Sequence, residues 1–158
     1  MKLDTIDTSI LKELQENARI SNVELANRVG LSPSACSRRV EQLEKSGTIE
    51  SYQAVISNQA LGQTITSIVH ISLDRQASTD MDEFEKAVSA CPYIVACFLM
   101  SGEYDYIIRV NARDMKEFEH VHKDWLSRLP GVSRIQSSFA MRTVVNRANI
   151  DVASLGGA

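Results

Sequence analysis

The chain has 158 residues, of which 44% are hydrophobic and 23% are charged, and its formal net charge is -3. This composition is ordinary for a globular protein and supplies enough apolar residues for one domain or two small ones. No apolar run approaches the roughly 20 residues that a membrane span needs. Because Met1–Asp4 does not begin a signal peptide either, we expect a cytoplasmic protein.

The cysteines and histidines do not predict a metal or cofactor site. Cys36, Cys91 and Cys97 are spaced like no zinc or redox motif, so buried thiols are expected. His120 and His122 are two residues apart on one predicted helix and therefore point away from each other.

The charge balance argues against a broad nucleic-acid-binding surface. Residues 1–60 hold seven Lys and Arg against eight Asp and Glu, a balance of -1. Any affinity for DNA must therefore come from locally placed cations and from doubling of the site in a dimer.

The first predicted helix begins at an N-cap carboxylate, either Asp4 or Asp7, and ends near Asn17. Its apolar residues have the spacing of one buried stripe: Ile6, Ile10, Leu11 and Leu14.

Two further helices follow in quick succession. The second is predicted to open with a capping box of Ser21 and Glu24 and to stop at Gly30, which suits a left-handed position. Ser32 can cap a third helix over 33–46, which has proline at its first position and glycine after its end. A turn of three or four residues with glycine fixes such helices at a steep angle, so the pattern is that of a helix-turn-helix.

The third helix has two distinct faces. Cys36, Val40 and Leu43 fall in one narrow sector, which we expect to be buried. The opposite side and its flanks carry Ser34, Ser37, Arg38, Arg39, Glu41 and Lys45.

This outer face suits the major groove of double-stranded DNA. Small hydroxyls allow close approach, Arg38 can reach guanine O6 and N7, and Arg39 and Lys45 can hold phosphates. The alternative is a surface helix with solvated charges, but the turn and both caps favour DNA binding. The candidate DNA-binding residues are Ser32, Ser34, Ser37, Arg38, Arg39 and Lys45.

A change of pattern suggests two domains. Residues 48–62 alternate briefly and then become polar, which predicts a strand and a hinge. We therefore expect a helix-turn-helix domain over 1–47, the hinge strand and linker over 48–62, a second domain over 63–146 and a tail over 147–158.

The second domain is predicted to alternate strands and helices in the order βαββαβ. Strands are expected at 65–73, 94–100, 106–110 and 132–145, and helices at 80–90 and from 114 to about 129. This order is that of a ferredoxin-like antiparallel sheet with two helices on one face, so the whole chain is predicted to be α+β, with a winged-helix-like N-terminal domain.

Apolar residues in this domain predict further burial. The strand at 94–100 is almost continuously apolar, as expected if both of its faces are covered. The last helix is expected to turn inward Met115, Phe118, Val121, Trp125 and Leu129. Ile68, Phe98 and Met100 would lie on the other face of the sheet, where a second copy packed sheet on sheet would cover them.

Several motifs occur in order along almost the whole chain: "LDTIDTSIL" as LDxxDxxIL, "GLSP", and "GEYD" as GxYD. With them the chain resembles the Lrp/AsnC (feast/famine) family of transcriptional regulators from Leu3 to about Asn146. The resemblance implies a homodimer that assembles into an octamer or related ring and binds DNA through residues 33–46. It also implies regulation of amino-acid metabolism by an amino-acid effector in the C-terminal domain.

The family's effector sites correspond here to one loop and part of the last strand. The resemblance implies these residues: Met100, Ser101, Gly102, Glu103, Tyr104, Asp105, Gln136, Ser137 and Ser138. Many relatives have threonine where this chain has Ser101.

The chemistry of an amino acid is compatible with this loop. Gly102 would let backbone N–H groups face a carboxylate, and Asp105 would accept from an ammonium group. The alternative is a tight β-hairpin with Gly102 at positive φ and Asp105 as a turn residue.

Two other classes of function bear on the sequence. An architectural DNA-compacting protein without a ligand remains the alternative. An enzyme is not expected, because the sequence shows no nucleophile beside a base and no motif with a carboxylate pair.

Overall fold

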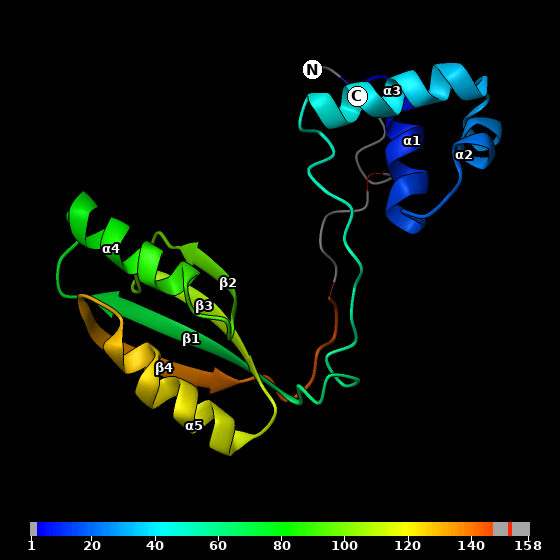
Figure 1. The fold of residues 1–158 in the computed structure, drawn as a ribbon. Coiled ribbons are helices and arrows are strands. Elements are labelled where there is room, and N and C mark those ends of the chain that lie inside the picture. Colours follow the sequence, from blue (N-terminus) through cyan, green and yellow to red (C-terminus); the bar gives the residue numbers. More distant parts are fainter. Residues whose placement is uncertain (1–2, 147–151, 153–158) are drawn as a thin grey trace. The chain divides into compact units, whose positions relative to one another are not determined.

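The computed structural model describes residues 3–146 and Val152, and it divides into two compact units. One unit contains the N-terminal residues through Val55, and the other spans residues 56–144 (Figure 1). The predicted tail at 147–158 lies outside the described residues except for Val152. In the described part of the chain, no helix has both the length and the apolar character needed to cross a membrane.

The N-terminal unit begins with helix α1, Thr5–Glu16, which is capped by Asp4. The Asp4 carboxylate accepts from the N–H of Asp7 at 2.7 Å, and the Asp7 carboxylate accepts from the N–H of Asp4 at 3.1 Å. This reciprocal pair satisfies two backbone donors that a helix start leaves unpaired. Of the two N-caps predicted from the sequence, Asp4 is the observed one.

Helix α2, Asn22–Val29, starts and stops as the sequence predicts. The Ser21 hydroxyl accepts from the N–H of Glu24, and Gly30 ends the helix with φ of 71°. The second half of the predicted capping box is wrong, because the Glu24 carboxylate accepts from Arg28 at 2.6 Å instead. A charged donor one turn later competes successfully with a neutral backbone N–H.

Helix α3, Pro33–Lys45, completes the helix-turn-helix. The Ser32 hydroxyl accepts from the N–H of Ala35, and Pro33 opens the helix as predicted. The three helices enclose a small core of fully or almost fully buried residues: Ile10, Leu25, Ala26, Cys36 and Leu43. The predicted inward face of α3 is confirmed at Cys36 and Leu43, with Val40 partly buried beside them.

The strand predicted within 48–62 is wrong, because the structure has no strand there. The N–H groups of Thr48 and Ile49 both donate to the carbonyl of Leu43, which ends α3 in a turn. Beyond that turn the side chain of Val55 is 89% exposed. An alternating pattern makes a strand only beside a hydrogen-bonding neighbour, and this chain supplies none.

The second unit confirms the predicted βαββαβ order. Its elements are β1 Ile65–Leu73, α4 Ser78–Ser89, β2 Ile94–Leu99, β3 Tyr106–Ala112, α5 Met115–Asp124, the 3-10 helix η1 Leu126–Arg128 and β4 Val132–Phe139. The strands form one antiparallel sheet in the order β2-β3-β1-β4. Strand β4 ends six residues before the predicted end at 145. Among the residues that the structure describes, it pairs only with β1. By Ala140, whose N–H donates to the carbonyl of Thr66, it has reached the start of that strand.

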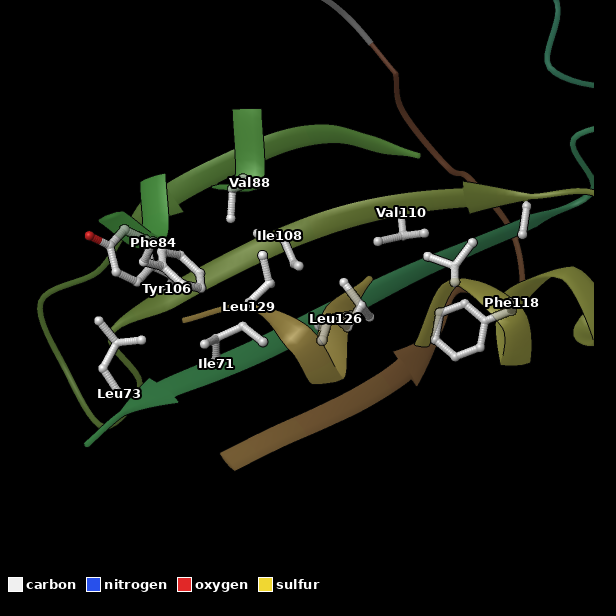
Figure 2. Packing of buried hydrophobic residues seen from close by; sticks show 13 residues of the cluster. Ile71, Leu73, Phe84, Val88, Tyr106, Ile108, Val110, Phe118, Leu126 and Leu129 are labelled. Atoms are coloured by element: carbon white, nitrogen blue, oxygen red, sulfur yellow. The ribbon is translucent and has the colours of Figure 1, made fainter. Parts of the chain in front are cut away.

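Helices α4 and α5 cover the same face of this sheet. Because side chains alternate along a strand, one face of β1 and one of β3 meet both helices (Figure 2). The buried side chains between them are Val69, Ile71, Leu73, Phe84, Val88, Tyr106, Ile108, Val110, Ala112, Phe118, Val121, Leu126 and Leu129. Burial of each large apolar side chain stabilises the fold by about 1.5–3 kcal/mol, so this cluster is the main support of the unit.

The prediction that both faces of β2 are covered stays a prediction, because it includes a second copy of the chain. In the single chain, Phe98 on the outer face is 60% exposed, and Leu99, which pairs with Tyr106 on the helix side at the end of this edge strand, is 58% exposed. The predicted burial of Met115 is wrong. Met115 is 55% exposed, because it lies with Phe118 and Phe139 at a shallow surface hollow rather than in the core. The uncovered face of the sheet carries Ile68 and Phe98, as expected from the sequence.

Candidate nucleic-acid interface and ligand site

The outer face of α3 is open along its length. Ser34, Ser37, Arg38 and Lys45 on α3 and its cap Ser32 are all exposed. Cys36 and Leu43 hold the opposite side of the helix in the core. A helix fixed on one side and polar on the other meets the geometric requirement for entry into a major groove.

Arg38 is an exposed cation in the middle of this face. Its side chain forms no hydrogen bond or ion pair with any residue in the described part of the chain. Its guanidinium therefore keeps all its donors for a partner outside the protein. A planar fork of this kind can pair with guanine O6 and N7.

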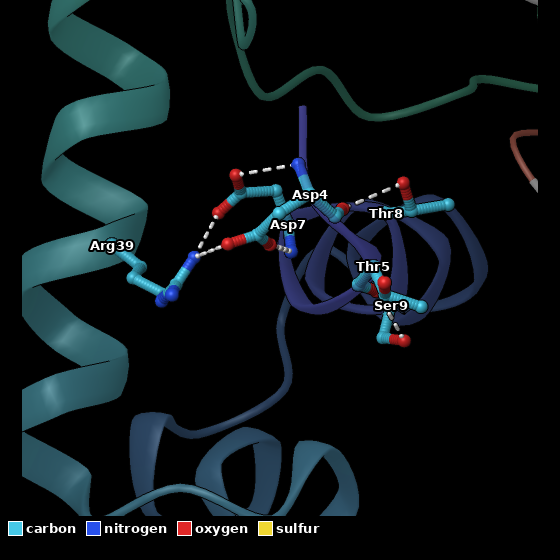
Figure 3. A network of polar contacts seen from close by, with 6 residues as sticks. All are labelled: Asp4, Thr5, Asp7, Thr8, Ser9 and Arg39. Carbon is cyan, nitrogen blue, oxygen red and sulfur yellow. Dashed lines mark hydrogen bonds and ion pairs between the residues drawn. The ribbon is translucent and has the colours of Figure 1, made fainter. Parts of the chain in front are cut away.

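Arg39 is in a different environment. Its Nη1 donates to Asp4 at 2.7 Å and to Asp7 at 2.8 Å, so both hydrogens of one nitrogen are used (Figure 3). The Asp7 side chain is only 9% exposed. The pKa of Asp4 is lowered, first by the N–H of Asp7 and then by the Arg39 guanidinium. The predicted phosphate contact of Arg39 stays a prediction.

The remaining predicted residues are lightly engaged. The hydroxyls of Ser32 and Ser34 lie 3.3 Å apart. Lys45 lies 3.3 Å from Glu41, but both side chains are more than half exposed, and such a pair contributes little.

Sequence reasoning missed one contact near this face. The Asn22 side-chain amide at the start of α2 donates to the carbonyl of Pro33 at 2.8 Å. It therefore links the first turns of α2 and α3. The contact spans eleven residues, which helical periodicity cannot reveal.

The candidate ligand loop, residues 100–105, connects β2 to β3. The N–H of Met100 donates to the carbonyl of Asp105 at 2.8 Å, and the N–H of Asp105 donates to the carbonyl of Ile71 at 2.9 Å. Gly102 lies outside the positive-φ region, so the alternative in which the hairpin needs glycine there is wrong. Ser101, Gly102 and Glu103 are exposed at the tip.

The Asp105 carboxylate is bound within the chain. One oxygen accepts from the N–H of Leu73 and the other from the Gln76 amide, each at 2.7 Å. These bonds tie the loop to the end of β1. The predicted role of Asp105 as an ammonium acceptor stays a prediction.

Tyr104 brings the two predicted segments together. Its hydroxyl donates to the Gln136 side chain on β4 at 2.9 Å, and its ring lies 4.7 Å from that of His70 on β1. His70 and Gln136 face each other across the β1/β4 pair, and the buried Nδ1 of His70 has no partner among the described residues. No motif in the sequence indicates His70, which is predicted only to lie on the outer face of a strand.

The last two predicted residues lie on opposite faces of β4. Ser138 pairs with Ile68 and shares the face of Gln136. Ser137 pairs with Val69, which points to the helices, so the structure does not bring Ser137 to Tyr104. Among the described residues, no group of three or more His, Cys, Asp or Glu side chains could hold a metal ion.

Two family models match this chain and together cover most of it. Residues 66–150 match the model described as the Lrp/AsnC ligand binding domain. Residues 3–50 match a winged helix-turn-helix DNA-binding model.

Curated relatives agree with these matches. The chain is 40% identical to the leucine-responsive regulatory proteins of Haemophilus influenzae and of Escherichia coli K12. Each match covers 90% of this chain and 86% or 87% of the relative. It is also 46% identical to an uncharacterized HTH-type transcriptional regulator of Sinorhizobium fredii, over 74% of this chain and 92% of that protein.

Solved structures show the same architecture. A transcriptional regulator from Neisseria meningitidis in complex with L-Met superposes with a TM-score of 0.90 at 36% identity, covering 98% of this chain and 99% of the other. An AsnC family transcriptional regulator from Agrobacterium tumefaciens gives a TM-score of 0.91 at 27% identity, covering 97% and 99%.

Proposed function

Because the chain belongs to the Lrp/AsnC family of DNA-binding transcriptional regulators, we propose that it controls genes of amino-acid metabolism and that a bound amino acid adjusts this control. It has the family's two parts, a helix-turn-helix and a ligand-binding domain. The identity of the effector and of the target genes belongs to the proposal.

The open outer face of α3 carries the proposal for DNA. Arg38, free of partners among the described residues, reads a guanine, while Ser32, Ser34 and Ser37 allow close approach and Lys45 holds a phosphate. The net charge of -3 gives no general attraction to DNA. We therefore expect specific binding to need two copies of α3 from one dimer.

The Tyr104 cluster, formed by Tyr104, His70 and Gln136, carries the proposal for the effector. It presents a hydroxyl, an imidazole and an amide beside the exposed loop tip of residues 101–103. These groups supply the donors and acceptors that a zwitterion needs. Leucine and methionine are the first candidates, since relatives are named as leucine-responsive or were solved with L-Met.

The exposed face of the sheet supports a homodimer. Phe98 and Ile68 lie on its uncovered side, and an exposed apolar side chain as large as Phe98, 60% exposed, favours burial against a partner. We further propose that such dimers assemble into an octamer or a similar ring. The protein would act in the cytoplasm.

A screen of the twenty amino acids for shifts in melting temperature tests the effector. Binding to the folded state raises the melting temperature, and we expect an apolar amino acid to do so. Tyr104→Phe should reduce that shift, because it removes the hydroxyl that orients Gln136. Tyr52→Phe is a matched control, since its hydroxyl also donates at 2.9 Å, to Glu44 in the other unit.

The same screen separates the architectural alternative. If no amino acid changes the melting temperature or the affinity for DNA, the chain binds DNA without a ligand and the effector proposal is wrong. If a shift occurs equally in the Tyr104→Phe variant, the effector binds elsewhere in the molecule.

A further inference from the structure

Two acidic residues lie against the DNA-facing helix, where their charge would oppose DNA binding. Asp4 and Asp7 at the start of α1 both accept from Arg39, at 2.7 and 2.8 Å (Figure 3). Carboxylates near a phosphate backbone repel it. We therefore look for a favourable effect of Asp4 and Asp7 on DNA binding that offsets this repulsion.

We propose that Asp7, assisted by Asp4, is a positioning residue for DNA recognition, and that Arg39 is an internal strut rather than a phosphate contact. The strut fixes the rotation of α3 about its own axis. Successive residues on a helix are about 100° apart, so holding Arg39 toward α1 sets the direction in which Arg38 points.

The core contacts of α3 and its contact with Asn22 fix the rotation of the helix less firmly. Cys36 and Leu43 fill the core, but apolar contacts are non-directional and tolerate a small rotation. The Asn22 amide holds only the first turn, at Pro33. The Arg39 contacts lie near the middle of the helix, where one nitrogen must satisfy two carboxylates at once.

Burial makes the contact firm. The Asp7 side chain is 9% exposed, and that of Arg39 is 30% exposed. A buried carboxylate needs its partner, because an unpaired charge at that depth is strongly disfavoured. The Nη1 group of Arg39 therefore stays with Asp7, because moving it to a phosphate would leave the Asp7 charge unpaired.

The same unit contains a natural control. Arg28 also bridges two carboxylates, Glu13 at 2.8 Å and Glu24 at 2.6 Å. That bridge joins α1 to α2 and does not touch α3. Its loss removes one cation and one double ion pair from the unit but leaves the rotation of α3 unaltered.

The test uses the full chain and two duplexes: one that the wild type selects from a random pool and a scrambled version of equal length. Affinities for both are measured by fluorescence anisotropy at several salt concentrations, and melting temperatures are followed by circular dichroism. The variants are Asp7→Asn, Arg39→Gln, their combination and Arg28→Gln.

We expect Asp7→Asn and Arg39→Gln each to lower the ratio of selected to scrambled affinity by about fivefold or more. The double variant should lose no more than either single one, because both remove the same contact. The salt dependence should stay that of the wild type, and Arg28→Gln should keep the wild-type affinity ratio.

Two results would overturn the proposal. Tighter binding by Asp7→Asn with an unchanged ratio would mean that Asp7 only repels DNA. A fall of about 1 in the salt slope for Arg39→Gln would mean that Arg39 contacts a phosphate. Should Asp7→Asn fail to fold, Asp4→Asn serves instead, since Asp4 is half exposed and asparagine caps a helix equally well. A ratio unchanged in Asp4→Asn would then count against the strut.

Discussion

Asp105 illustrates how one side chain can support a ligand loop from within. Both of its oxygens accept hydrogen bonds, from the N–H of Leu73 and from the Gln76 amide. Asp105→Ala leaves the Leu73 N–H without this partner, so the free energy of unfolding should fall by about 1–3 kcal/mol. Chemical denaturation measures this change. The exposed neighbour Asp74 is the control, and equal stability of both alanine variants would contradict the anchoring role.

Two carboxylates predict how stability responds to acid. The pKa of Asp4 is lowered by the N–H of Asp7 and by Arg39, and the pKa of Glu117 is lowered mainly by the Arg113 side chain. Each folded pKa lies below the unfolded value near 4, so each group stabilises the fold above about pH 4. That contribution is lost as the pH falls through the lowered value.

The stabilisation that Asp4 and Glu117 contribute should therefore change little from pH 7 to about pH 5. Below about pH 4 this stabilisation is lost, and the melting temperature should decline. Circular dichroism melts at successive pH values measure this decline. Asp4→Asn and Glu117→Gln should each make the decline shallower. An identical acid response in the wild type and in the double variant would contradict the assignment.

Local chemistry of single residues was predictable, and their distant partners were not. Ser21, Gly30 and Ser32 have their predicted roles because a cap depends on neighbours within a few residues. Arg38 and Arg39 look alike in the sequence, but Arg39 finds its carboxylates 32 and 35 residues away. Helical periodicity gives the face of a side chain and says nothing about what approaches that face.

At the scale of elements, the uncovered face of the sheet predicts association through β2. Phe98 is 60% exposed on that face, and a charge there would have to be desolvated in a sheet-on-sheet dimer. Phe98→Glu should therefore shift the protein to smaller species in sedimentation velocity. Val23→Glu is the control, because Val23 is 58% exposed on α2 in the other unit. An unchanged distribution in Phe98→Glu would place the dimer contact elsewhere.

The errors among the elements share a cause. Strands at 65–73 and 106–110 were found because they lie at the centre of the sheet and have one strongly apolar face. The strand predicted within 48–62 has a similar alternation but no neighbour in this chain. Strand β4 runs antiparallel to β1 and ends where it reaches the first residues of β1. Periodicity shows that a segment can be a strand, and pairing decides whether it is one.

At the scale of the whole molecule, reading of DNA and sensing of a ligand lie in two units with separate cores. An effector can influence DNA binding only if it favours one arrangement of the DNA-binding helices over another. In the proposed assembly, that arrangement is the spacing of α3 pairs in the oligomer. The resemblance implied the site residues, and the structure adds His70 beside Tyr104, which no motif indicated.

DNA reading by α3 is tested by comparing the affinities of wild type and Arg38→Ala for the selected duplex and for its single-base variants. Arg75→Ala is the control for the loss of one exposed cation in the other unit. We expect Arg38→Ala to bind about 5- to 150-fold more weakly, which is about 1–3 kcal/mol, and to lose discrimination at one base pair. Wild-type affinity and wild-type discrimination in that variant would contradict the claim that the outer face of α3 reads DNA.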